Sequence, residues 1–249
     1  MEVAVLTHVG HYRQVNEDSG EVIKRGDDAL MAIVADGMGG HQAGDVASQM
    51  AVDHLRKAFD EVDLDKSNQD WEDWLLHQIR GANQSIFDYA QQHESHYGMG
   101  TTLAVTLCFK EYYIVAHVGD SRVYRYHDQQ LEKVTEDHSL VNELVRTGQI
   151  SEEQAEIHPQ RNVITRALGT DEDVKADIRT LFYLDHEHIL LCSDGLTNMI
   201  EEEQMKDILD QYPTADEKAA VLLQYALDAG GDDNITLILL HKIDEDGRK

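Results

Sequence analysis

Three aspartates lie where apolar segments meet turns, and they are the first candidates for chemistry in this sequence. Asp36 and Asp194 each follow an apolar, strand-like run, and Asp233 closely precedes one. Asp-Gly is a strong turn signal, so any one of them alone would be interpreted as a turn residue. A buried strand fixes the backbone at its ends, however, so the three carboxylates can be aimed at one point. Like charges about 4 Å apart repel by about 4 kcal/mol at an effective dielectric near 20, and convergence therefore requires cations or protons.

The types of ligand indicate which cations. All the candidates are oxygen donors, and the sequence contains no His-Cys cluster, no HExxH spacing and no twelve-residue calcium loop. Oxygen ligands favour Mg²⁺ or Mn²⁺ over Zn²⁺. Glycine lets the backbone approach closely, so the carbonyl of Gly37 can add a ligand beside Asp36. Two cations roughly 3.5–4 Å apart would hold and deprotonate a bridging water, which suits in-line attack on a phosphomonoester without a covalent intermediate.

A phosphate dianion also needs a positioned positive charge, and Arg13 is the leading candidate. A guanidinium can bind two phosphate oxygens at once. Glu17 and Asp18 follow Arg13 closely in the sequence. By themselves, all three would be interpreted as solvent-exposed surface or turn residues.

The elements that position these residues follow from hydrophobic periodicity. Strand-like segments lie at residues 3–7, 29–35, 101–109, 112–118, 122–126, 178–184, 188–192 and 235–241. Helix-like segments lie at residues 44–59, 70–92, 140–147, 202–211 and 214–229, and a short helix begins at Ser151.

The order of these elements predicts the fold class. Strands come mostly in consecutive groups, two helices separate the second strand from the third, and the breaks at residues 110–111 and 127–130 are typical of hairpin turns. This pattern favours an α+β fold with antiparallel sheets over a doubly wound parallel sheet. The chain has no internal repeat or low-complexity linker, and a single domain is the simplest interpretation.

Composition excludes several classes of partner. The 249 residues contain 48 acidic and 21 basic side chains, a formal net charge of −27, and the basic ones are not clustered. Nucleic acid is therefore not expected as a partner. The N-terminus lacks the features of a signal peptide, and the longest apolar run, residues 29–35, is too short to span a bilayer. Cys108 and Cys192 sit in apolar strand-like segments as expected free thiols, so we expect a cytoplasmic protein without membrane insertion.

Together, the motifs resemble those of the metal-dependent protein phosphatase family, also called protein phosphatase 2C. The matching segments are residues 13–18, 34–48 (VADGMGGHQAGDVAS), 98–102 (GMGTT), 118–122 (VGDSR), 191–196 (LCSDGL) and 231–236 (GDDNIT). Each is weak alone, but six in order are very specific and span nearly the whole chain. The sequence is most similar to stand-alone bacterial members that counteract a membrane-bound serine/threonine kinase.

The resemblance implies a four-layer α/β/β/α sandwich of two mainly antiparallel sheets flanked by helices. It also implies hydrolysis of phosphoserine and phosphothreonine in proteins by a metal-activated water. The expected cofactors are two Mn²⁺ or Mg²⁺ ions per active site, with a third, weaker ion. The expected partners are phosphorylated proteins, including a cognate serine/threonine kinase, and we expect the protein to be a monomer.

The resemblance also implies the metal ligands. Asp36 would bridge both metals, and the carbonyl of Gly37 would bind one of them. Asp194 and Asp233 would complete the second metal's ligands, and Asp120 with Asp194 would hold the third ion. The family places its last ligand immediately before asparagine, which selects Asp233 over the preceding aspartate.

Around the metals, the resemblance implies further roles. Arg13 would bind the substrate phosphate, while Asp18, with Glu17 beside it, would act behind the metals through bound water. Animal members carry a histidine two residues after the bridging aspartate, often proposed as the general acid, but here that position is Met38. The nearest histidine is His41, which either protonates the leaving alkoxide or shapes the mouth of the site.

The resemblance divides the chain into a catalytic domain, residues 1–243, and a short tail, residues 244–249. Residues 135–166 match the position of the family's flap, which borders the active site and affects substrate choice. Without the resemblance, the same segment would be interpreted as a surface connection.

Three other functions remain open from the sequence. The first is a phosphatase for a narrow set of regulators, such as an anti-sigma-factor antagonist. The second is an inactive relative that serves as a binding module, although Asp36 and Asp194, whose loss would mark such decay, are both present. The third is an acidic cation-buffering protein, which would explain the charge but not the ordered motifs.

Overall fold

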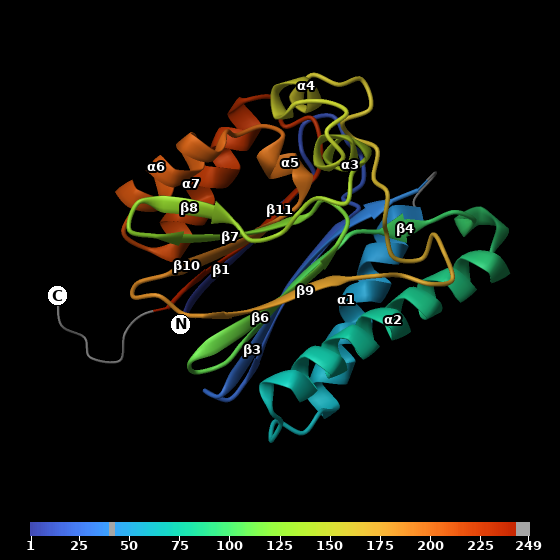
Figure 1. Cartoon of the computed structure of the whole chain (residues 1–249), viewed down its shortest axis with the longest axis horizontal. Helices are drawn as coiled ribbons and strands as arrows, with labels where there is room; N and C mark the ends of the chain where they lie inside the picture. Colours follow the sequence, from blue (N-terminus) through green and yellow to red (C-terminus); the bar gives the residue numbers. More distant parts are fainter. Residues whose placement is uncertain (40–42, 243–249) are drawn as a thin grey trace.

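Two antiparallel sheets pack face to face between two layers of helices in the computed structural model, which describes residues 1–39 and 43–242 (Figure 1). The first sheet has the strand order β1 (Glu2–His8), β11 (Ile235–His241), β10 (His188–Cys192), β7 (Arg122–His127) and β8 (Gln130–Lys133). The second has the order β2 (Asp18–Arg25), β3 (Ala29–Met38), β5 (Leu103–Cys108), β6 (Tyr112–Val118) and β9 (Asp177–Phe182), and β4 (Gly100–Thr101) pairs with the end of β3. Each of these neighbouring pairs is antiparallel.

The helices form the two outer layers. The second sheet is covered by α1 (Ala43–Glu61) and α2 (Asn68–Gln92), and the short helix η1 (Glu94–His96) follows. The first sheet is covered by α5 (Asp194–Thr197), α6 (Glu202–Gln211) and α7 (Ala215–Asp228). The remaining helices, α3 (Leu140–Arg146) and α4 (Glu152–Glu156), lie together at one end of the molecule (Figure 1).

Alternation along the central strands explains the layered core. In β3, Met31 and Ile33 face the helices α1 and α2, whereas Ala32 and Val34 face the other sheet. Because both faces of the strand are covered, it reads in the sequence as an unbroken apolar run. The predicted four-layer sandwich is confirmed.

Most predicted elements are present, with some changes at their ends. Strands β2 and β8 were missed, because β2 begins with polar residues at a sheet edge and β8 is a four-residue, mostly exposed strand. The expected strand at residues 101–109 is divided into β4 and β5 at Thr102. The predicted turn between β7 and β8 has positive φ at both Asp128 (46°) and Gln129 (60°), as a two-residue hairpin requires.

The domain boundary predicted near residue 243 and the tail 244–249 lie at and beyond the end of the described residues, so both remain predictions. Among the described helices, none is long and apolar enough to cross a membrane.

Candidate active site

Asp36 lies near the end of β3, which continues past the predicted boundary to Met38. It stands opposite Asp18 of β2 in the sheet register. Its main chain is fixed on the other side by Thr102, whose hydroxyl accepts from the Asp36 amide (3.0 Å) and whose amide donates to the Asp36 carbonyl (2.8 Å). The pairing of β4 with Gly37 and Met38 extends this rigid frame beyond the carboxylate.

Asp194 is the first residue of α5, directly after β10. The preceding residue, Ser193, is fastened to β11 because its amide donates to the carbonyl of Thr236 (3.0 Å). The carboxylate of Asp194 accepts a hydrogen bond from the side chain of Asn198 (2.9 Å). Asp120 enters from a third direction, in the turn between β6 and β7.

The carboxylates of these elements lie close enough to repel one another. Burial, and then the charges of Asp18, Asp194, Asp120 and Asp233, raise the pKa of Asp36 well above its ordinary value. Burial is also the main cause that raises the pKa of Asp18 and of Asp120, each to about 7, and the charge of Asp194 contributes to both. The structure therefore brings together Asp18, Asp36, Asp120 and Asp194, which lie in separate segments of the sequence.

The environment of these acids fits divalent cations. One oxygen of the buried Asp18, Oδ2, accepts from the hydroxyl of Ser193 (2.7 Å), but the other, Oδ1, is buried without a hydrogen-bond partner. A buried carboxylate oxygen without a partner is costly, and a cation or its bound water would satisfy it. The converging side chains offer only oxygen atoms, which suits Mg²⁺ or Mn²⁺.

Gly37 is required by close packing. A Cβ atom there would lie 2.1 Å from the carbonyl oxygen of Gly44 and 2.5 Å from that of Glu17. The amide of Gly37 donates to the same Glu17 carbonyl (3.1 Å). Only glycine fits this position, because the backbone beside Asp36 lies in close contact with Glu17, just before β2, and with the start of α1.

Arg13 and Asp233 form an ion pair at the rim of the acidic cluster. Nη2 of Arg13 donates to Oδ2 of Asp233 at 2.7 Å, and the arginine side chain is 49% exposed. Oδ1 of Asp233 accepts from the amide of Asn234 (2.8 Å). Glu17 lies nearby, where burial raises its pKa and the charge of Arg13 opposes that shift.

Asn234 is a structural residue of the site that the sequence analysis named only as part of a motif. Its buried side chain accepts from the amide of Glu17 (2.7 Å) and donates to the carbonyls of Val9 (2.9 Å) and Val15 (3.0 Å). This one amide group fastens the segment that carries Arg13 to the start of β11. Its position directly after Asp233 was the available signal.

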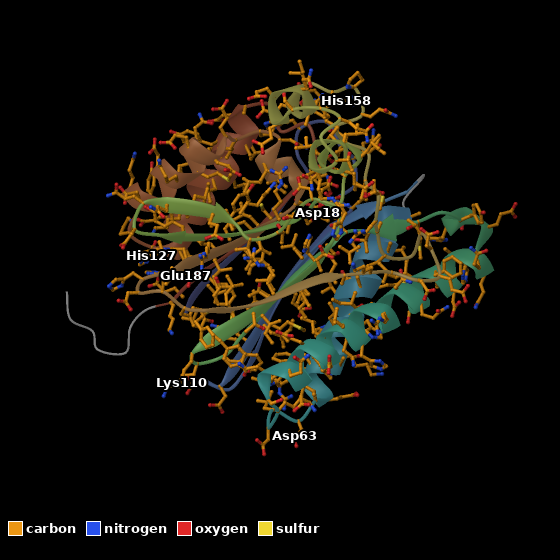
Figure 2. The ribbon with its side chains drawn as sticks, viewed as in Figure 1. Asp18, Asp63, Lys110, His127, His158 and Glu187 are labelled. Carbon is orange, nitrogen blue, oxygen red and sulfur yellow. The ribbon has the colours of Figure 1, made fainter. Side chains whose placement is uncertain are left out.

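Residues 135–166 lie at the end of the molecule where α5 carries Asp194 (Figure 1). Figure 2 shows Asp18 nearer to His158 of this segment than to Asp63 and Lys110, which lie towards the opposite end. Predicted site residue His41 lies outside the described residues, whereas Met38 is the last residue of β3.

Comparison with known proteins gives a consistent result. Residues 8–228 match the family model described as "Protein phosphatase 2C". The protein named serine/threonine phosphatase stp of Listeria welshimeri is 44% identical over 242 residues, which cover 97% of this chain and 96% of the relative. The crystal structure of serine/threonine phosphatase Stp1 from Staphylococcus aureus has a TM-score of 0.92 at 39% identity and covers 98% of this chain and 95% of its own. The catalytic domain of the phosphatase PstP, in complex with 2 manganese ions, has a TM-score of 0.84 at 32% identity, and the match covers 98% of each chain.

Proposed function

Because this chain belongs to the protein phosphatase 2C family and is a metal-dependent serine/threonine protein phosphatase, we propose that its converging aspartates hold the catalytic cations. The observation that carries the proposal is the convergence of Asp18, Asp36, Asp120 and Asp194 from four separate elements, where burial, and then neighbouring carboxylates, raise their pKa values. Removing several carboxylates from water together is costly, and bound cations would offset that cost while keeping the carboxylates ionised.

The ligands are assigned by position. Asp36 and the carbonyl of Gly37 would hold a pair of Mn²⁺ or Mg²⁺ ions from the end of β3, and Asp194 and Asp233 would complete the set from the segments next to β10 and β11. Asp120 with Asp194 would hold a third, weaker ion. The manganese-bound PstP structure supports the metal class. When bound, such a pair of divalent cations lowers the pKa of water and supplies a nucleophile near neutral pH.

The chain's own groups then do the positioning. Arg13 leaves its ion pair with Asp233 to bind the substrate phosphate, and its half-exposed guanidinium can reach two phosphate oxygens. Asp18 and Glu17 lie behind the ligands and orient water. The candidate for protonating the leaving alkoxide is His41, whose ordinary pKa near 6.5 suits that role.

The substrates are proteins carrying phosphoserine or phosphothreonine, among them a cognate serine/threonine kinase. We assign residues 1–243 to one catalytic domain that acts as a monomer in the cytoplasm. Residues 135–166 form the flap that borders the mouth of the site. The similarity to bacterial serine/threonine phosphatases over nearly the whole chain supports phosphorylated proteins as the substrates.

The test of substrate class uses paired peptides. Phosphothreonine and phosphotyrosine versions of one peptide are incubated with the purified protein and Mn²⁺, and phosphate release is measured. We expect release from the phosphothreonine peptide at a rate at least tenfold above that from phosphotyrosine. Equal rates, or a preference for phosphotyrosine, would contradict the proposal.

A further inference from the structure

His138 lies outside the acidic cluster and is hydrogen-bonded to the turn that carries Asp120. Its ring nitrogen Nδ1 accepts from the amide of Gly119 (3.1 Å), and its own amide donates to the carbonyl of Gly119 (2.9 Å). The histidine is 5% exposed, so both bonds are shielded from water. Two reciprocal bonds to one residue fix the main chain immediately before Asp120.

The same turn is connected to Asp36. The hydroxyls of Ser121 and Thr102 are 2.6 Å apart, and the Thr102 hydroxyl also accepts from the amide of Asp36. Gly119 packs against Thr102 so closely that a Cβ atom would lie 2.7 Å from its methyl group, and its φ of +99° favours glycine. A buried path therefore runs from His138 through this turn to the backbone of Asp36.

His138 also lies where the two ends of segment 135–166 meet. Its carbonyl accepts from the amide of Thr165 (2.7 Å), and Ser139 forms a β-bridge with Ile164. A movement of the two ends of this segment would therefore also change the contact between His138 and Gly119.

On the outer side of the ring, ligand atoms of His117, His138 and Asp177 lie within 4.8 Å of one another, which is a spacing compatible with a metal site. The hydrogen bonds argue against it. Burial lowers the pKa of His138 to about 4, so the neutral ring has one lone pair, and the Gly119 amide uses it at Nδ1. Nε2 then carries the proton and faces Asp177 Oδ2 (3.4 Å), while the other oxygen of Asp177 accepts from Arg166 (3.2 Å). Both ring nitrogens of His138 are therefore occupied by these contacts, and the cluster is better explained as a hydrogen-bonded group than as a metal site.

We propose that His138 is a positioning residue that holds the Gly119–Ser121 turn, and through it Asp120 and Asp36, in the geometry that binds the cations. The inference rests on the proposed metal-ligand roles of these two aspartates. It makes the base of segment 135–166 part of the metal centre's support, although none of its side chains needs to touch a cation.

Two amide substitutions distinguish the role of Nδ1 of His138 from that of Nε2. In His138→Asn the amide oxygen can take the place of Nδ1 and accept from Gly119, whereas in His138→Gln the amide reaches the place of Nε2 and the bond to Gly119 is lost. His158→Gln, in the same segment but near its tip, is the matched control (Figure 2). Mn²⁺ binding is measured by titration calorimetry, and exchange of the Gly119 amide hydrogen is measured in EDTA.

We expect His138→Gln to weaken Mn²⁺ binding on the order of tenfold, as the loss of supporting groups behind metal ligands does, and to speed exchange of the Gly119 amide. His138→Asn and His158→Gln should stay within about threefold of the wild type. Equal binding by all four proteins, or equal losses in the Asn and Gln variants, would overturn the inference.

Two further measurements distinguish a loss of Mn²⁺ binding from a failure of the variant to fold. Thermal unfolding in EDTA shows whether each variant folds. If His138→Gln does not fold, Ser121→Ala cuts the same path one step further in, and wild-type Mn²⁺ affinity in that variant would overturn the inference. Wild-type protein that binds no Mn²⁺ at all would instead contradict the proposed function.

Discussion

The ion pair between Arg13 and Asp233 joins the phosphate-binding candidate to a metal-ligand candidate. In the proposed roles, a substrate phosphate would compete with Asp233 for the guanidinium, and a cation would compete with Arg13 for the carboxylate. When phosphate and cation are both bound, phosphate replaces Asp233 as the partner of Arg13, and the cation replaces Arg13 as the partner of Asp233. The ion pair therefore holds both charged side chains near their proposed positions before substrate and metal bind.

Replacing Arg13 tests its role. A hydrogen bond to a charged group contributes about 1.5–3 kcal/mol, so Arg13→Ala should lower kcat/KM for a phosphothreonine peptide by roughly 10- to 100-fold at saturating Mn²⁺. Arg13→Lys should recover only part, because an ammonium cannot form the two-pronged contact. Steady-state kinetics check this, and an Arg13→Ala value within twofold of wild type would count against phosphate binding by this side chain.

Asn234 offers a test of how the site is fastened together. Asn234→Ala leaves the Glu17 amide and the carbonyls of Val9 and Val15 without their partner. Buried groups without partners cost about 1–3 kcal/mol each before relaxation, so we expect a loss of about 2–4 kcal/mol in the free energy of unfolding. Urea unfolding in EDTA measures it, with the exposed Asn68→Ala as control, expected within about 0.5 kcal/mol of wild type. Similar values for the two variants would refute the assignment.

The sequence identifies the candidate acids, but not the side chains whose hydrogen bonds hold the backbone around them. Asp36 and Asp194 stand out because an acid directly after an apolar strand is conspicuous. Thr102 and Asn234 do not, because their value lies in hydrogen bonds to backbone groups 66 and 217 residues away in the chain. The type of a polar residue does not indicate a hydrogen-bond partner so far away in the sequence, and such a partner becomes visible only in the folded structure.

Between elements, a buried contact joins β10 to α7. Nζ of Lys218 lies 2.6 Å from Nε2 of His188, whose ring stacks on that of His241 at 4.0 Å. Tyr126 of β7 approaches the same ring edge-on. Burial, and then His241 and Lys218, lower the pKa of His188 to about 3, so the ring is neutral in the folded protein.

This contact predicts a loss of stability in acid. The folded pKa lies below the unfolded value of about 6.5, so the unfolded chain takes up the proton first and stability is lost as pH falls below about 6.5. Between pH 7 and pH 5 this one group accounts for about 2 kcal/mol. His188→Gln should remove that part of the pH dependence, measured by urea unfolding at both pH values in EDTA. Parallel pH profiles for the two proteins would show that His188 is not responsible.

The elements themselves were largely predictable, for reasons visible in β3 and β8. β3 is buried on both faces, so its apolar run is unmistakable, whereas β8 is short and exposed and leaves no pattern. The sequence predicts that β3 ends at Ala35, because Asp36 and Gly37 have the pattern of a turn. Pairing of Asp36 with Asp18 of β2, and of Gly37 with Thr101 of β4, keeps both residues extended, and β4 is too short to be recognised in the sequence.

For the whole molecule, the formal charge of −27 makes cations a stabilising ligand. A cation that binds only the folded state adds about 2.7 kcal/mol at a hundredfold excess over its Kd, or roughly 5–10 °C in Tm for a chain of this size. Thermal unfolding with Mn²⁺ and with EDTA should show this difference. Asp36→Asn should lose most of it, and an equal rise in wild type and variant would point to nonspecific charge screening.

Hydrolysis of a phosphothreonine peptide by wild type and Asp36→Asn, each with Mn²⁺ and with EDTA, tests most directly whether the convergent aspartates hold catalytic cations. We predict rapid phosphate release only by the wild type with Mn²⁺, and loss of activity in EDTA that is restored by added Mn²⁺. Asp36→Asn should remain inactive under both conditions while staying folded. Hydrolysis that persists in EDTA, or in Asp36→Asn at wild-type rate, would show that these aspartates do not hold catalytic cations.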